Sequence, residues 1–436
     1  MGLIYHGLAH GIARGGVPSA RLAIYKVCGP TGCDYTDILS AFDQAVADGV
    51  DIISISLGND DPLELTFDPI AIGAFHAIER GIPTVNSAGN KGPSRASINS
   101  YAPWIFTVAA SDIDRKIVNK LLLGKDATLV SNLIDHKVVL CDQEPILEEV
   151  KKSRASGFIY PSLDNYSLVM PLPVVALSTD DLNSPDIIAP GVEILAAYSS
   201  IGSPSGITWE KNFVEFSILS GTYMACPHVA VVAAFVKSFH PYASLYSEAE
   251  FAYGSGHIDP LKATTPGLVY ETSFQEYLKI WCNISRSTPG SVIPTSSSCP
   301  TKSTAKDINY PSMAVQVKVG ASFAVAFPRT VTNVGRANSK YVAHIEGEPS
   351  KLHVSVEPDT LQFTTIKHKN FFALTVRGNK MKPFTIKHLS LVWTDGVHKV
   401  HSPIVVYTMS HGEPAPTPSM LCITFMLILL IAMPLY

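Results

Sequence analysis

The stretch that most constrains the fold covers residues 220–241 and reads SGTYMACPHVAVVAAFVKSFHP. Its first three residues are small and predict a tight turn. The apolar run over 229–236 is too continuous for a helix that exposes one face, so we expect a helix buried on most sides. Unpaired N–H groups at the start of such a helix stabilise an anion, which makes Thr222 and Tyr223 candidates for a functional site. The alternative is a structural helix that contains a free cysteine, Cys226.

The first part of the chain alternates between short apolar runs and amphipathic segments. We expect buried strands over 21–27 and 50–57, further strands over 82–86 and 105–110, and helices over 37–48 and 69–80. Strands and helices that alternate with short turns predict a parallel sheet with helices on both faces, an α/β fold. Ligands bind at the carboxyl ends of such strands, and Leu57–Gly58 and Gly89–Asn90 lie at two of these ends.

Composition excludes several classes of function. The 436 residues suggest two or three domains, and the formal net charge of −4 without a basic block makes nucleic acid an unexpected partner. No group of Cys and His residues has the spacing of a zinc site, so we expect neither a metal nor another cofactor. Among the 7 cysteines, Cys28 and Cys33 are spaced to close a small loop, and Cys282 and Cys299 a larger one.

Signals for the cellular location point in two directions. Asn165 and Asn283 begin glycosylation sequons, which together with the cysteines favour the secretory pathway. Residues 1–16 have neither a charged nor an apolar region of the kind that makes a signal peptide.

Several motifs resemble plant subtilisin-like serine proteases, the subtilases of the cucumisin type (peptidase family S8). The segment GTYMACPH matches the family's nucleophile motif, Gly-Thr-Ser-Met-Ala-x-Pro-His, except that Tyr223 stands at the position of the nucleophilic serine. The segments GIARGGVPSARLAIYKV, DGVDIISISLG, VNSAGNKGP and IIAPGVEILAA also resemble the family. Matching segments recur from about residue 7 to residue 407, which is nearly the whole chain.

The resemblance assigns roles to residues at the two strand ends. It makes Asn90 the side-chain amide that donates to the oxyanion of the reaction, whereas the residues alone also allow a left-handed turn residue. It makes Ser56, Leu57 and Gly58, with Ala88 and Gly89, a rim that pairs with the backbone of a peptide or protein substrate. It also implies an extracellular location, in the apoplast or cell wall.

The resemblance also divides the chain. It implies a catalytic domain over 1–115 and 181–270 that begins part-way through the family pattern, with a shortened protease-associated domain over 116–180 inserted in it. Regularly spaced short strands predict an all-β sandwich over 302–409, which resembles a fibronectin-III-like domain and includes Trp393 as a core residue.

The C-terminal end departs from the family pattern. Residues 412–436 are a Pro-rich linker and an apolar tail that is marginal in length for a membrane span. Membrane contact through the tail, a lipid-anchor signal and read-through of a gene model are the three interpretations.

The catalytic set is incomplete in this chain. Subtilases use Asp, His and Ser in that order, and the family's Asp-Thr-Gly and Gly-His-Gly-Thr-His motifs do not occur here. We interpret His6 and His10 as polar residues on a frayed terminus, and His228 as a packed core histidine. The phenol of Tyr223 extends beyond the position of a serine hydroxyl and is a poor nucleophile without a base. We expect the side chains of Ser220 and Thr222 to point away from the cleft.

Three hypotheses follow. The chain is a serine endopeptidase by descent that is inactive as written, a pseudoprotease that binds peptides or uses its fibronectin-like domain for contacts, or a truncated product that does not fold stably.

Overall fold

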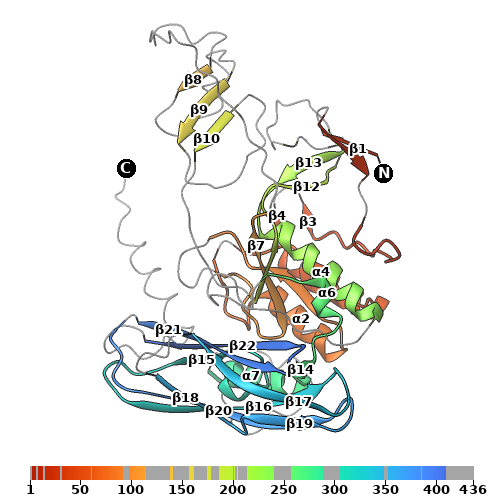
Figure 1. Ribbon diagram of the computed structural model, residues 1–436. Helices are drawn as coiled ribbons and strands as arrows, with labels where there is room; N and C mark the ends of the chain where they lie inside the picture. The colour runs from red at the N-terminus through yellow and green to blue at the C-terminus, as the bar shows by residue number, and fades with distance from the viewer. Residues whose placement is uncertain are drawn as a thin grey trace.

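The structure is a computed structural model that describes residues 2–5, 8–12, 15–29, 32–59, 61–91, 98–113, 138–140, 157–161, 174–177, 186–199, 201, 204, 214–239, 257–287, 305–347, 352–383 and 385–408. An α/β part lies above a flattened C-terminal β-sandwich, whose strands are drawn in blue-green and blue at the bottom of Figure 1.

A four-stranded parallel sheet forms the centre of the α/β part. Its strands are β5 (Ile53–Ile55), β6 (Thr84–Ser87), β7 (Ile105–Ser111) and β11 (Ile187–Pro190), in the order β11-β7-β6-β5. Helices α1 (Tyr35–Asp48) and α2 (Pro69–Glu79) pack on one face and α4 (Thr222–Phe239) on the other. Strand β7 contacts both layers, since Ile105 lies in the core beside α1 and α2 and Val108 in the core beside α4. The predicted α/β fold with helices on both faces is confirmed.

Local signals set the ends of α1 and α2, which lie where the sequence predicted them. The carboxylates of Asp34 and Asp68 cap the helices by accepting hydrogen bonds from the backbone N–H groups of Thr36 (2.8 Å) and Ile70 (2.9 Å). Helix α1 ends at Gly49, whose φ of 68° is left-handed and therefore favours glycine.

An aromatic cluster joins α2 to α7 (Phe274–Ser287). The ring of Phe75 is fully buried, and its centroid lies 5.0 Å from that of Trp104 and 4.7 Å from that of Trp281. Tilted and edge-on ring pairs at such distances contribute about 0.5–1.5 kcal/mol each beyond the area they bury. Helix α7 is therefore part of the α/β core, although it follows the end that the sequence predicts for this part.

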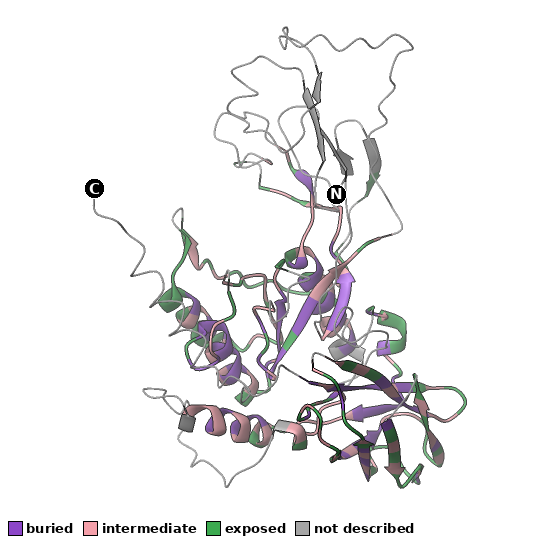
Figure 2. Ribbon diagram, turned by 90° about the vertical axis from the view of Figure 1, so that its left-hand side faces the viewer, coloured by how far each residue is buried: buried purple, intermediate pink, exposed green. Residues whose placement is uncertain are grey.

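The C-terminal sandwich consists of two sheets, with the orders β14-β16-β20-β18 and β15-β22-β21-β17-β19. Its strands are β14 (Leu268–Tyr270), β15 (Met313–Gln316), β16 (Phe323–Asn333), β17 (Ser339–Glu346), β18 (Leu352–Glu357), β19 (Thr360–Phe363), β20 (Lys369–Gly378), β21 (Ile386–Thr394) and β22 (Lys399–Tyr407). Trp393 is fully buried, with its ring centroid 5.1 Å from that of Phe372. Buried residues line the inside of this sandwich at the lower right of Figure 2. The predicted all-β C-terminal region and its tryptophan core are confirmed.

Strand β14 interlocks the two parts. It pairs antiparallel with β16, Leu268 lying opposite Asn333, whereas the sequence predicts that residues 181–270 belong wholly to the catalytic part. Helix α7 then returns to the α/β core before the chain enters the rest of the sandwich.

The remaining described elements are β1 (Gly2–Tyr5), β2 (Leu8–Ile12), β3 (Cys28–Gly29), β4 (Gly32–Cys33), β8 (Val138–Leu140), β9 (Gly157–Pro161), β10 (Val174–Leu177), β12 (Ile194–Ala197), β13 (Phe216–Leu219), α6 (Pro260–Ala263) and the 3-10 turn η1 (Ala305–Asp307). Strands β8, β9 and β10 form a parallel sheet within the expected insertion. Their assignment to a protease-associated domain stays a prediction, as do the domain limits.

The predicted buried strand over 21–27 is wrong. These residues are irregular, and the side chains of Leu22 and Ile24 are 86% and 88% exposed. The predicted strand over 50–57 is reduced to β5, which lies at the edge of the sheet. An apolar run gives a propensity for a strand, but a strand forms only beside a neighbour that pairs with it, and no described strand pairs with 21–27.

The prediction that the N-terminus is frayed is also wrong. Strands β1 and β2 pair antiparallel, with Gly2 opposite Ile12. His10 lies in β2 and His6 lies outside the described residues.

No helix in the described ranges is long and apolar enough to cross a membrane. The apolar tail over 412–436 lies outside those ranges.

Candidate functional site

The structure brings the predicted site residues together at one edge of the parallel sheet. Residues 56–58 follow β5, residues 88–90 follow β6, and α4 begins beside them. The Ser56 hydroxyl donates to the carbonyl oxygen of Tyr223 at 3.1 Å, and the Gly89 N–H donates to the hydroxyl oxygen of Thr222 at 3.2 Å. These contacts span more than 130 residues of chain, so the site is a product of the tertiary fold.

Thr222 fixes the orientation of the Asn90 amide. Oδ1 of Asn90 accepts hydrogen bonds from the Thr222 N–H at 2.9 Å and from the Thr222 hydroxyl at 3.0 Å. A backbone N–H can only donate, so the amide oxygen must face Thr222 and the Nδ2 group must face the other way. Asn90 is thus arranged as a donor, which is the role that the resemblance implies.

Thr222 is a residue whose role the sequence interpretation missed. Its side chain is buried, with 5% exposure, and it holds the loop after β6 against the start of α4. No local signal predicts this role, because both partners of the hydroxyl lie more than 130 positions away in the chain.

Glycine is required at the turn into α4. Gly221 has a φ of 137°, and its N–H donates to the Gly191 carbonyl at 2.8 Å. A Cβ added to Gly221 would lie 3.0 Å from Nδ2 of Asn90. Any side chain here would strain the backbone and press on the one amide that the site positions.

Pro227 explains the contact between Ser56 and Tyr223. It lies inside α4 and has no N–H, so the carbonyl of Tyr223, four residues earlier, receives no helical hydrogen bond from it. The Ser56 hydroxyl fills that position. The strand end after β5 is therefore tied to the first turn of the helix.

The Tyr223 side chain is 42% exposed beside Asn90, and its hydroxyl forms no hydrogen bond with any described residue. His228, one turn further along α4, is turned back onto its own helix, because its Nδ1 lies 2.8 Å from the Met224 carbonyl. Within the described part of the chain, Tyr223 therefore has no base to remove its proton.

Cys226 cannot replace the missing serine. Its thiol is fully buried and lies 3.4 Å from the Ile55 carbonyl and 3.5 Å from that of Val85. Burial raises the pKa of this thiol, which keeps it in the unreactive neutral form.

Asn99 supports the rim at Gly58 and Gly89. Its backbone N–H donates to the Ala88 carbonyl at 2.9 Å, and its side-chain amide donates to the Asn59 carbonyl. A Cβ on Gly58 would lie 3.2 Å from that amide, so the rim is narrow at this point. Leu57 is half-buried and packs against the core beside α1 and α2.

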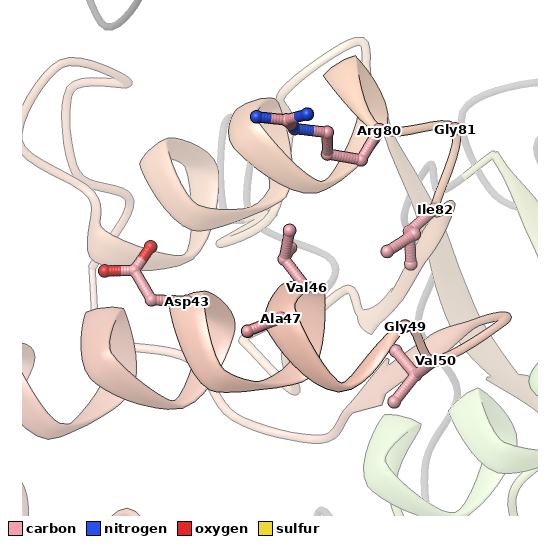
Figure 3. Close-up of a pocket in the computed structure, with 8 residues that line it drawn as sticks. All are labelled: Asp43, Val46, Ala47, Gly49, Val50, Arg80, Gly81 and Ile82. Carbon is pink, nitrogen blue, oxygen red and sulfur yellow. The ribbon is translucent and has the colours of Figure 1, made fainter.

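A hollow with a volume of about 590 Å³ lies elsewhere, between the ends of α1 and α2. Figure 3 shows its lining, which includes Val50 and Ile82 just before β5 and β6. It is therefore at the amino ends of these strands, opposite to the edge where ligands bind in such sheets.

The other candidate residues lie apart from this site. Cys28 and Cys33 form a disulfide between β3 and β4, and Cys282 is disulfide-bonded, while Cys299 is outside the described residues. Asn283 is half-buried within α7, and Asn165 is outside the described residues. In the ranges that the structure describes, no group of three or more His, Cys, Asp or Glu side chains could hold a metal ion.

Comparisons with known proteins identify the family. Residues 2–264 match the family model described as "Subtilase family". The chain belongs to the subtilase family. It is therefore a subtilase-family serine peptidase by homology, and residues 307–406 match a second model, described as "Fibronectin type-III domain".

Relatives in Arabidopsis thaliana show the same relationship over most of the chain. Subtilisin-like protease SBT4.10 is 41% identical, with 93% of this chain and 67% of the relative covered. Subtilisin-like protease SBT4.8 is 38% identical, with 92% and 69% covered. Among solved structures, the prenylagaramide maturation protease PagA is 19% identical at a TM-score of 0.32 and covers 58% of this chain and 75% of its own.

Proposed function

We propose that this subtilase does not hydrolyse peptide bonds and that it binds extended peptides at the edge formed by residues 56–58 and 88–90. The observation that carries the proposal is Tyr223, which stands at the nucleophile position with no described base beside it. The loss of a nucleophile or base lowers kcat by about a millionfold in the subtilisin used as the general example.

The binding half of the proposal is supported by what remains intact. Asn90 is held as a donor by Thr222, and the strand end at Ser56 is tied to α4. A peptide that lies along such a strand end gains main-chain hydrogen bonds, as in other β-augmentation sites.

The test uses the whole purified chain. We expect no labelling by a fluorophosphonate probe and no cleavage of a mixture of extended peptides above the rate in buffer. Cleavage or labelling that disappears in Tyr223→Phe would overturn the claim of inactivity.

Peptide binding is measured separately, by fluorescence anisotropy. A peptide that binds should lose most of its affinity when alternate backbone nitrogens are methylated, because methylation removes the main-chain donors without changing the side chains. Equal affinity of the two peptides, or no affinity for either, would overturn the binding claim.

We also propose that the protein is extracellular. The disulfide between Cys28 and Cys33 and the bonded Cys282 require an oxidising compartment, and the family resemblance points the same way. Protein recovered from the extracellular fluid should carry the oxidised cysteine pair, with glycans on Asn165 or Asn283, by mass spectrometry. Recovery only from the cytosol, with reduced cysteines, would contradict this location.

A further inference from the structure

Charge is distributed very unevenly along this chain. Residues 302–409 contain 14 Lys and Arg against 6 Asp and Glu, a formal net charge of +8, although the whole chain has a net charge of −4. The residues outside 302–409 therefore have a formal net charge of −12. The sandwich is a basic unit attached to an acidic one.

The fold gathers part of this charge at one end of the sandwich. Lys318 lies in the turn between β15 and β16, Arg377 near the end of β20, Lys380 and Lys382 in the loop between β20 and β21, and Lys387 at the start of β21. We call these five residues the basic end. They are separated in the sequence by up to 69 positions, which is why no basic block is visible there.

Backbone contacts hold the basic end in shape. The Gly320 N–H donates to the Met381 carbonyl at 3.0 Å, which joins the turn of Lys318 to the loop of Lys380 and Lys382. The Thr408 hydroxyl donates to the Lys382 carbonyl at 2.5 Å and accepts from the N–H of Thr385 at 3.0 Å. Hydrogen bonds therefore fix the backbone of the loops that bear these cations.

Four of the cations of this end are available to a partner. Lys318, Arg377, Lys380 and Lys382 are exposed, and none of them forms an ion pair with another residue in the described ranges. Glu346, the last residue of β17, lies opposite Ser390 in β21, three positions beyond Lys387.

The described contacts between the sandwich and the preceding chain lie at the residues around β14 and at Tyr310, not at the basic end. Lys369 pairs with Glu271 at 2.6 Å, and the Gly267 carbonyl accepts from the N–H groups of Val334 and Gly335. None of these contacts involves a residue of the basic end.

We propose that the basic end binds an acidic polysaccharide, with its exposed lysines and Arg377 neutralising the carboxylates of the polysaccharide. This goes beyond peptide binding, and the choice of a polysaccharide rests on the extracellular location proposed above. A flexible polyanion fits point charges spread over several loops, and the acidic remainder of the chain directs it to this end by repulsion.

Two other classes of polyanion fit less well. Single-stranded nucleic acid needs exposed aromatic rings for base stacking. Among the Phe, Tyr and Trp residues of the described sandwich, the exposed one is Phe371, near the start of β20 at the opposite end. An anionic membrane needs an apolar anchor beside the cations, and Ile386 is only 36% exposed.

The experiment measures binding of the whole chain to immobilised polygalacturonate at low ionic strength. We expect retention that is lost on raising the salt, and at least about tenfold weaker binding in the triple variant K318Q/K380Q/K382Q. The matched control is R336Q/K340Q/K367Q, which removes the same charge from exposed positions at the other end of the sandwich. The control should change affinity by less than about twofold.

Several results would overturn the proposal. One is an equal loss of affinity in the two triple variants, which would indicate an effect of net charge alone. Others are binding of neutral cellulose as strongly as polygalacturonate, or tighter binding of phosphatidylserine vesicles or single-stranded DNA. Circular dichroism checks the fold of each variant, and Arg377→Gln alone, a single exposed change, should weaken binding in the same direction.

Discussion

The family resemblance places Tyr223 at the position of the nucleophile. The groups around it are intact, since Asn90 is oriented by Thr222 and the Tyr223 carbonyl is bound by Ser56. In the function proposed above, the change at this site is the side chain of Tyr223, because the contacts that hold the scaffold around it are present.

A first prediction concerns restoring the serine. Tyr223→Ser in this chain should still show no peptide hydrolysis, because His228 is bound to the Met224 carbonyl and no described base faces the start of α4. Turnover is followed with a fluorogenic peptide, and Tyr223→Ala is the matched control. Turnover by the serine variant but not by the alanine variant would show that a base does reach this position.

A second prediction concerns Asp186, which lies at the contact between the parallel sheet and the C-terminal region. Its Oδ2 accepts from the Thr107 N–H at 2.7 Å and its Oδ1 from the Tyr310 hydroxyl at 3.4 Å. Removal from water raises the pKa of this carboxyl from 3.8 to about 6 in the folded chain. The folded state thus favours the protonated form, which contributes stability below roughly pH 4 that is lost as the pH rises to roughly 6.

The variant Asp186→Asn should remove this pH dependence, since an amide keeps the shape and an acceptor but does not ionise. Between pH 4.5 and pH 7 we expect the wild-type chain to lose about 2 kcal/mol relative to the variant, measured by urea unfolding at both values. Parallel stability curves for the two proteins would show that Asp186 is not the titrating group.

At the scale of elements, the start of α4 connects the two strand ends that form the site. It contacts the loop after β6 through Thr222 and the strand end after β5 through the Tyr223 carbonyl. A helix whose first turn is bonded to two neighbouring strand ends has little freedom to shift, so the rim and the Asn90 amide are positioned as one unit.

A third prediction tests the contact between the start of α4 and the loop after β6. Thr222→Val keeps the shape of the side chain but removes the hydroxyl that bridges Gly89 and Asn90, and it should lower the free energy of unfolding by about 1–3 kcal/mol. Thr222→Ser, which keeps the hydroxyl, should lose less. Equal losses in urea unfolding for the two variants would assign the effect to packing of the methyl group.

At the scale of the whole molecule, the α/β part and the sandwich share elements. Strand β14 belongs to the sandwich sheet, while α7, which follows it, packs in the α/β core. Arg329 strengthens the junction from the sandwich side: its guanidinium is buried and donates to the carbonyls of Tyr310 at 2.7 Å and Lys306 at 3.0 Å.

A fourth prediction follows from the way in which β14 and α7 connect the two parts. If a recognition sequence for a specific protease is inserted between residues 288 and 301, the two pieces should stay together after cleavage. The pairing of β14 with β16, and the ion pair of Glu271 with Lys369, would still connect them. The measurement is size-exclusion chromatography in buffer and in urea, both with a reductant, because Cys282 is disulfide-bonded and such a bond could also connect the pieces.

Separation of the pieces in buffer would show that the sandwich over 302–409 is independent, as the sequence predicts. As a control, a chain carrying the insert but not cleaved should elute at the same volume as the wild-type chain.

The local sequence was sufficient to predict those helices and strands whose ends are determined by residues close by in the chain. The caps at Asp34 and Asp68 placed α1 and α2, the glycine after α1 ended it, and regular short strands predicted the sandwich with Trp393 in its core. The motif around Tyr223 is also local, so both the family and the altered residue can be recognised from the amino-acid sequence alone.

Only the tertiary structure decided the rest, because each of the remaining features depends on partners far away in the chain. The run over 21–27 has the composition of a strand but no described strand beside it to pair with, and it stays exposed. Thr222 orients Asn90 across 132 positions, and β14 pairs with a strand more than 60 residues away. The basic end exists because loops that are separate in sequence meet at one tip of the sandwich.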